Sequence, residues 1–311
     1  MRCRTTSGCL SPEGPFRSAI LFLVVAGAAI AAAPRRLIRH HRAVAVQLRP
    51  STEFSHGELA SLFTAAYEGY FVPFSVDETT IQFMVDVFDL EPARSLVAVH
   101  DGVPVGLANL GRRGARTWLG GVGVVVTRRR EGIGELLTRG LLEQADAAGA
   151  AAMALEVIVE NRAAISLYEK LGFVRTRELE VLSLAAGEST VEGAETAPVD
   201  VARSLIRAHR DADEPWQRDD DTVDRLLRRD PAPQAMVAGG AAAVYRVTGD
   251  NIGLVQAAGD EHDLGTILAS LRARGPVSAL NYPAGGEVAR ALRSAGADVS
   301  LRQYEMVKPL V

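Results

Sequence analysis

The pattern of hydrophobic and polar residues along positions 44–184 predicts strands and helices in alternation. In some stretches apolar residues recur every three to four positions, as in a helix with one buried face. In others they alternate or run unbroken, as in strands. The expected helices cover 56–69, 77–88, 133–148 and 164–171, and the expected strands cover 44–49, 95–99, 103–109, 118–126, 152–159 and 173–184. This order is typical of an α/β (α+β) fold with a central sheet flanked by helices.

The same order of elements recurs, in weaker form, about 125 residues later. The sequence ALEV at 154–157 corresponds to ALNY at 279–282, and EVLSL at 180–184 corresponds to EMVKPL at 305–310. Further strands are expected at 236–245 and 252–257. Between the copies, residues 185–198 (AAGESTVEGAETAP) are small, polar and acidic, which predicts a linker. We therefore expect domains at 44–184 and 199–311, related by an internal duplication.

The residues before position 44 form a basic leader with an apolar segment at 19–33. A basic stretch, then 15 uncharged residues ending in alanines, resembles a secretory signal. As a helix this segment spans only about 22 Å, less than the roughly 30 Å core of a bilayer. Three interpretations stay open: a signal-like leader, a short anchor that holds the domain on the cytoplasmic side, or a true start further downstream.

Charge and cysteine content narrow the classes of function. The formal net charge is -4, and the excess of basic residues is confined to residues 1–43, so a general nucleic-acid binder is not expected. Both cysteines, Cys3 and Cys9, lie in the leader, which leaves the folded part without a disulfide or a cysteine nucleophile. The six histidines are scattered, and no metal site is expected.

The turn between the apolar strand at 118–126 and the helix at 133–148 reads TRRREGIG. A helix N-terminus leaves about four backbone N–H groups unpaired and carries a partial positive charge. Glycine lets a ligand approach the backbone closely, and arginine adds forked donors for phosphate oxygens. The turn therefore has the chemistry of a pyrophosphate cradle. An isolated G-x-G is, however, more often explained by ordinary packing at a turn, with the three arginines as solvated loop charges.

Arg129-x-x-Gly132-x-Gly134 after a strand resembles the acyl-CoA-binding motif (R/Q-x-x-G-x-G/A) of the GNAT N-acetyltransferase superfamily. The segment LEVIVENRAAISLYEKLGF at 155–173 resembles the second signature of that superfamily. The likeness covers roughly residues 44–184 and implies a GNAT fold in a tandem arrangement with a degenerate second domain. One departure is Val126, which stands where many members have a proline.

The resemblance implies acetyl-CoA as the co-substrate and assigns its binding residues. Backbone groups of the strand end would pair with the pantetheine arm, the amides of the turn would hold the pyrophosphate, and Asn161 would contact the CoA arm. The implied set is Val124, Val125, Val126, Arg129, Arg130, Glu131, Gly132, Ile133, Gly134, Glu135 and Asn161.

Acetyl transfer to an amine needs a base for the ammonium and an acid for the leaving thiolate. Glu156 and Tyr168 are the candidates, because their spacing matches the L-E-V…L-Y pattern of GNAT enzymes that acetylate protein N-termini. Burial between Leu155 and Val157 would raise the pKa of a carboxyl group at 156 toward that of a useful base. Both residues are also compatible with plain structural roles, Glu156 on a solvated strand edge and Tyr168 in the core.

The second copy lacks these groups. Its turn reads DEHDLG at 260–265, Asn281 replaces Glu156, and Leu292 stands at the place of Tyr168. It is not expected to bind CoA, but it could form a wall of the acceptor cleft or mediate a homodimer.

The sequence thus predicts a cytoplasmic, acetyl-CoA-dependent N-acetyltransferase. Its acceptor is an amine, on a small molecule or a peptide N-terminus, and attack is direct. The alternatives are a non-catalytic acyl-CoA-binding or regulatory module and a membrane-anchored enzyme facing the cytoplasm. Four aromatic residues and a proline, Tyr67, Tyr70, Phe71, Phe74 and Pro73, fall where the family builds its acceptor wall, although they are equally compatible with packing.

Overall fold

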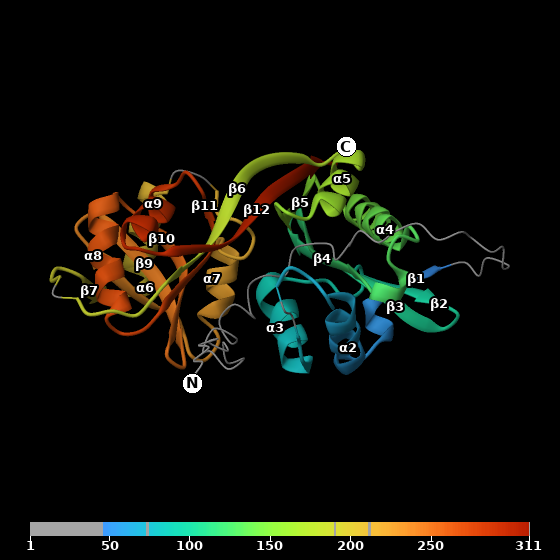
Figure 1. Ribbon diagram of the computed structural model, residues 1–311, viewed down its shortest axis with the longest axis horizontal. Helices are drawn as coiled ribbons and strands as arrows, with labels where there is room; N and C mark the ends of the chain where they lie inside the picture. Colours follow the sequence, from blue (N-terminus) through green and yellow to red (C-terminus); the bar gives the residue numbers. More distant parts are fainter. Residues whose placement is uncertain (1–45, 73–74, 190, 211–212, 311) are drawn as a thin grey trace, which may run out of the picture.

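The computed structural model describes residues 46–72, 75–189, 191–210 and 213–310, and it contains one continuous twelve-stranded sheet. The sheet has two halves, each covered by helices on both faces (Figure 1). The strand order is β1-β2-β3-β4-β5-β12-β6-β11-β10-β9-β8-β7. The fold is therefore of the mixed α/β class with a central sheet, as expected.

The first half follows the predicted pattern of elements closely. Its elements are β1 (Gln47–Pro50), η1 (Ser51–Glu53), α2 (His56–Ala66), α3 (Glu78–Phe88), β2 (Leu96–His100), β3 (Val103–Arg113), β4 (Arg116–Val124), η2 (Val126–Arg128), α4 (Ile133–Ala147), β5 (Ala152–Ile158), α5 (Arg162–Lys170) and β6 (Val174–Leu184). Local signals explain several boundaries. Ser55 and Glu58 form a capping box at α2, and the Asp77 side chain accepts from the Thr80 amide at α3.

The second half repeats this order element by element. It comprises β7 (Glu195–Ala197), α6 (Val199–His209), α7 (Asp220–Leu226), β8 (Gln234–Ala238), β9 (Ala241–Thr248), β10 (Asn251–Ala258), α8 (Glu261–Arg272), β11 (Val277–Pro283), α9 (Glu287–Ser294) and β12 (Asp298–Pro309). Strands β5 and β11 begin 125 positions apart, which is the offset seen in the sequence.

The last strand of each half is exchanged with the other half. Strand β12 inserts between β5 and β6, and β6 in turn inserts between β12 and β11, all antiparallel. The two long strands run side by side across the junction (Figure 1). Each half is therefore completed by backbone hydrogen bonds from the other.

Helices on the two faces bury separate apolar clusters. In the first half α2 and α3 pack on one face, around Phe63, Met84 and Trp118, and α4 and α5 pack on the other, around Leu137 and Tyr168. In the second half α8 and α9 cover one face of the sheet and α6 covers the other.

Three sequence expectations need correction. The proposed linker at 185–198 is not irregular throughout, because Glu195–Ala197 form β7 and pair with β8. The single strand expected at 236–245 is a hairpin of β8 and β9 that turns at Gly239 and Gly240. Val126 lies in the short helix η2 and not in the strand, since β4 ends at Val124. The boundaries proposed for the two domains stay a prediction.

The apolar leader segment at 19–33 lies outside the described residues, as do Pro73 and Phe74. Within the parts that the structure describes, no helix is long and apolar enough to cross a membrane.

Candidate functional site

The central feature of the first half is a gap between β4 and β5. The two strands are parallel and pair at one end only, through Arg116–Trp118 with Ala152–Ala154. Beyond Trp118 and Ala154 no pairing joins them, although β3 continues along β4 and β12 along β5. The facing edges of the two strands are therefore not hydrogen-bonded to each other beyond this point, and we call this gap the β4–β5 slot. On β4, the carbonyls of Val122 and Val124 already accept from Tyr67 and Arg129.

The slot ends at the N-terminus of α4, where the predicted cradle lies. The N-cap residue Gly132 has a left-handed backbone (φ 84°) and supplies no side-chain acceptor to the first turn. A Cβ placed on Gly132 would meet no atom within 4 Å, so the space in front of it is open. Arg130 also has a positive φ of 73°, which costs a non-glycine residue about 1 kcal/mol or more. An uncapped helix N-terminus behind a strained turn suits a phosphate group.

Arg129 hydrogen-bonds backbone carbonyl groups, which the sequence analysis did not predict. Its Nε donates to the carbonyl of Val124 at 2.9 Å, and its Nη2 donates to the carbonyls of Ala66 and Glu68 at 3.0 and 2.8 Å. The side chain thereby ties the end of α2 to the end of β4. Partial burial lowers the pKa of the guanidinium. A role beside the pyrophosphate stays a prediction.

The other predicted cradle residues have diverse surroundings. Arg130 and Glu131 are exposed, and Glu131 pairs with Arg128 at 3.3 Å. Ile133 and Gly134 are buried in the first turn of α4. Glu135 pairs with Arg139 and Lys170 instead of capping its own helix. The amide of Val125 is already used, since it donates to the carbonyl of Val105.

Glu156 is the most strongly perturbed acid near the slot. It lies on β5, two residues past the last β4–β5 pair, with 1% of its surface exposed. One carboxylate oxygen accepts from the indole of Trp118 and from the amide of Gln217, both at 2.9 Å. Desolvation raises the pKa of Glu156 to about 7, against the lowering effect of these two hydrogen bonds.

The exchanged strand places further charges beside Glu156. Glu305 on β12 stands directly opposite it, and Arg177 on β6 is opposite Glu305. The Arg177 guanidinium binds both oxygens of Glu305 at 2.8 and 2.9 Å. The negative charge of Glu305 raises the pKa of Glu156, and Arg177 partly offsets this.

Gln217 comes from the second half and was missed by the sequence reasoning. The segment Trp216–Asp219 crosses to the first half, where Trp216 stacks on Trp118 with ring centroids 5.8 Å apart and donates to the carbonyl of Phe88. Arg113 stacks on Trp216 at 4.2 Å and donates to its carbonyl. The sequence feature that could have pointed to this segment is a single tryptophan, Trp216, in an otherwise polar stretch. That feature does not show which residues the segment contacts.

Tyr168 lies on the other face of the sheet. It is fully buried on α5, edge to face with Phe173 at 5.7 Å, in the cluster formed by α4 and α5. Trp118, the partner of Glu156, belongs to the cluster under α2 and α3. The two predicted catalytic residues therefore lie on opposite faces of the sheet.

Asn161 caps α5, because its side-chain oxygen accepts from the Ala164 amide at 3.2 Å. A hydrogen bond with the Asn161 side chain lowers the pKa of the Tyr70 hydroxyl, but burial raises this pKa more strongly. Tyr67 is buried, stacks on Phe63 at 4.6 Å and donates to the Val122 carbonyl at 3.4 Å. These contacts favour packing roles for Tyr67 and Tyr70, whereas Phe71 is 53% exposed and accessible to an acceptor.

The corresponding slot of the second half is blocked by its own side chains. Strands β10 and β11 also pair at one end only. Arg218 lies there, 3.3 Å from the ring centroid of Tyr282, paired with Glu214 and donating to the Leu280 carbonyl. At the N-terminus of α8 the Asp260 carboxylate accepts from the Asp263 amide, where a phosphate would otherwise be placed.

No group of three or more potential metal ligands occurs within the described ranges. The groups that the structure brings to this site are the buried carboxylate of Glu156, the buried phenol of Tyr168 and the open N-terminus of α4.

Comparisons with known proteins agree with this geometry. Residues 58–173 match the model of the Acetyltransferase (GNAT) family, which confirms the resemblance inferred from the turn. No curated protein matches the chain in sequence. Among solved structures, a GCN5-related N-acetyltransferase from Sphaerobacter thermophilus has 16% identity and a TM-score of 0.63, covering 85% of this chain and 95% of that one.

Two further structures also extend over both halves. A protein of Pyrococcus horikoshii has 20% identity and a TM-score of 0.62, covering 88% of this chain and 93% of that one. A tandem GNAT protein from the clavulanic acid biosynthesis pathway has 13% identity and a TM-score of 0.56, covering 85% and 98%. At these identities the likeness shows that the fold is shared.

Proposed function

We propose that this chain, whose residues 58–173 form a GNAT acetyltransferase domain, transfers an acetyl group from acetyl-CoA to a primary amine. The acceptor amine belongs to a small molecule or to a peptide N-terminus. The observation that carries the proposal is the buried carboxylate of Glu156 next to the β4–β5 slot, with a pKa of about 7. A carboxylate of that basicity can take a proton from an ammonium near neutral pH.

The residues of the slot and the cradle fit the donor. The backbone groups of β4 and β5 that remain unpaired in the slot can pair with the amides of an extended pantetheine chain, as a strand would. The open N-terminus of α4 at Gly132 can hold the pyrophosphate without a clash, because no side chain caps it.

Catalysis would divide between the two faces of the sheet. Glu156 would accept the proton of the attacking amine, directly or through one water, while Trp118 and Gln217 hold its carboxylate in place. Tyr168 would donate its phenolic proton to the leaving thiolate, whose basicity is similar to that of a phenol. Attack of the amine on the thioester needs no covalent enzyme intermediate.

The non-catalytic alternative has no support among these contacts. Binding acyl-CoA does not require a base. A fully buried carboxylate with a raised pKa makes the folded protein less stable, so a module that only binds would gain nothing from Glu156.

Calorimetric titration of acetyl-CoA into the full chain tests the donor site. We expect binding by the parent and none by Gly132→Glu, because the new carboxylate would stand in the open cradle. Gly114→Glu is the matched control, since Gly114 also has a positive φ and open space but lies at the β3–β4 turn. Equal binding by both variants, or no binding by a folded parent, would refute the assignment of the cradle.

A further inference from the structure

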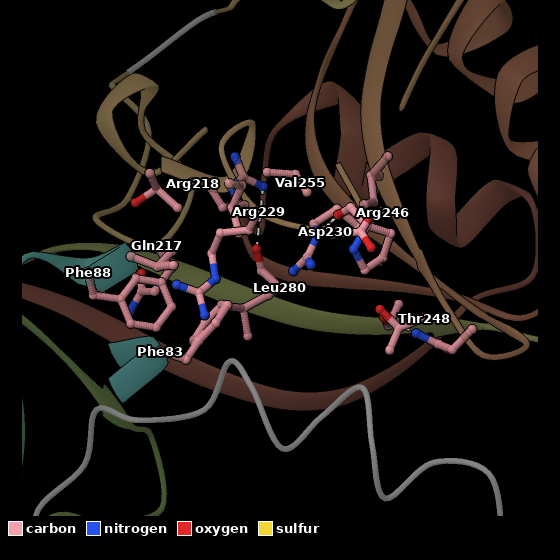
Figure 2. A pocket seen from close by; sticks show the side chains of 18 of the residues that line it. Phe83, Phe88, Gln217, Arg218, Arg229, Asp230, Arg246, Thr248, Val255 and Leu280 are labelled. Carbon is pink, nitrogen blue, oxygen red and sulfur yellow. Dashed lines mark hydrogen bonds between the residues drawn. The ribbon is translucent and has the colours of Figure 1, made fainter. Parts of the chain in front are cut away.

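A cavity of about 300 Å³ lies at the junction of the two halves, apart from the β4–β5 slot. Its floor is the face of the second half of the sheet, where alternate residues of β9, β10 and β11 point to the same side. Its roof includes Phe83 and Phe88 of α3. Figure 2 shows Phe88 and Gln217 at one end and Arg246 and Asp230 at the other. The volume is at the lower end of the range for small-molecule sites.

Most of the cavity wall is apolar, and its charged lining residues are Arg218, Arg229, Asp230 and Arg246. Leu226, Leu254, Val255 and Leu280 line it together with the two phenylalanines. A ligand that fills this part must present an apolar or aromatic body, because an uncompensated polar group there would lose its hydrogen bonds to water.

Arg246, at the end of the cavity far from Phe88, differs from the other charged lining residues (Figure 2). Its side chain is half-buried, and its Nε donates to the Pro231 carbonyl at 3.0 Å. Of the carboxylates that the structure describes, none pairs with it, whereas Arg229 pairs with Asp86 at 3.0 Å and Arg218 with Glu214. Desolvation and the nearby charge of Arg229 lower the pKa of Arg246. The terminal nitrogens of this guanidinium are therefore available to a ligand anion.

We propose that this cavity binds a small monocarboxylate with an apolar or aromatic body, its carboxylate on Arg246 and its body against Phe83 and Phe88. The exposed carboxylate of Asp230 at the same end disfavours ions of higher negative charge. The site does not depend on the proposed acetyl transfer. Because Gln217 lines the cavity and also donates to Glu156, a bound ligand lies one side chain away from that carboxylate.

Titration calorimetry and ligand-observed NMR on the full chain, without acetyl-CoA, test the site. The probes are 3-phenylpropanoate, its neutral amide and inorganic phosphate. We expect 3-phenylpropanoate to bind at least about tenfold more tightly than the amide or phosphate, because a hydrogen bond to a charged group contributes that much.

Two variants and a control locate the binding. Arg246→Gln removes the charge, and Gly253→Val fills the cavity from β10, where an added Cβ meets nothing closer than 3.9 Å. Both should weaken binding at least about tenfold, while Arg228→Gln, an exposed arginine outside the cavity, should not change it.

Circular dichroism would confirm that each variant is folded. Absence of binding by the folded parent, equal binding of the amide or of phosphate, or full binding by either folded variant would each overturn the proposal.

Discussion

The raised pKa of Glu156 makes a quantitative prediction about stability. A group whose pKa is higher in the folded than in the unfolded chain favours folding when protonated and opposes it when ionised. For Glu156 the pKa rises from 4.5 to about 7 on folding. At about 1.4 kcal/mol per pKa unit, the ionised carboxylate makes the folded protein less stable by about 3 kcal/mol. The contribution of protonated Glu156 to the free energy of unfolding is thus fully present below pH 4.5 and is lost as the pH rises through 7.

Replacing Glu156 by Gln removes the charge and keeps the shape. The Gln oxygen can accept from both Trp118 and Gln217, which now donate to one carboxylate oxygen. We expect Glu156→Gln to be more stable than the parent by about 3 kcal/mol at pH 8.5 and by about 1 kcal/mol at pH 5. The same change should lower the acetyl-transfer rate about 10²- to 10⁴-fold, because the base is lost.

Urea unfolding at a series of pH values measures the difference, with tryptophan fluorescence as the probe. The two tryptophans of the chain, Trp118 and Trp216, are stacked on each other, and Trp118 hydrogen-bonds Glu156. Native fluorescence should therefore also titrate near pH 7 in the parent and lose that step in the variant. Glu160→Gln, at an exposed turn, is the control: it should leave both the stability difference and the fluorescence step of the parent unchanged. A stability difference that is the same at pH 5 and pH 8.5 would refute the reasoning.

Two further predictions follow from the hydrogen bonds of Gln217 and Arg129. Gln217→Leu removes a hydrogen bond that favours the ionised form of Glu156. The acidic limb of the pH profile of the acetyl-transfer rate should therefore move above pH 7. An unchanged profile would show that Gln217 does not influence Glu156. Arg129→Met leaves three carbonyl groups without their donor and should lower the free energy of unfolding, measured by urea titration, by about 2–4 kcal/mol. Arg130→Met, at an exposed position, is the control and should have little effect. Equal losses in both variants would contradict the role of Arg129 in linking α2 to β4.

Much of the first half could be read from local patterns. The helices at α2, α3 and α4 follow from apolar spacing, and their starts follow from Ser55, Asp77 and Gly132. The open N-terminus of α4 was predictable for the same reason, since its residues lie within one turn of chain. The side-chain cap on the corresponding helix of the second half is equally local, because Asp260 caps α8 from the adjacent position.

The environment of Glu156 could not be read in this way. Its partner Gln217 is 61 positions away and in the other half. Its neighbour Glu305 reaches it only because β12 crosses into the first half. A hydrophobic pattern shows that a residue is buried, but it does not specify which distant polar atom will satisfy it.

The sequence by itself thus determined most elements of the first half, the repeated order of elements and the open N-terminus of α4, because each is encoded within a few residues. The tertiary structure alone decided the exchange of β6 and β12, the link that Arg129 makes between α2 and β4, and the position of Arg246 at the cavity. These depend on which segments meet when the two halves fold together. A strand can pair with any partner that presents free backbone groups, so the choice is made by packing across the junction.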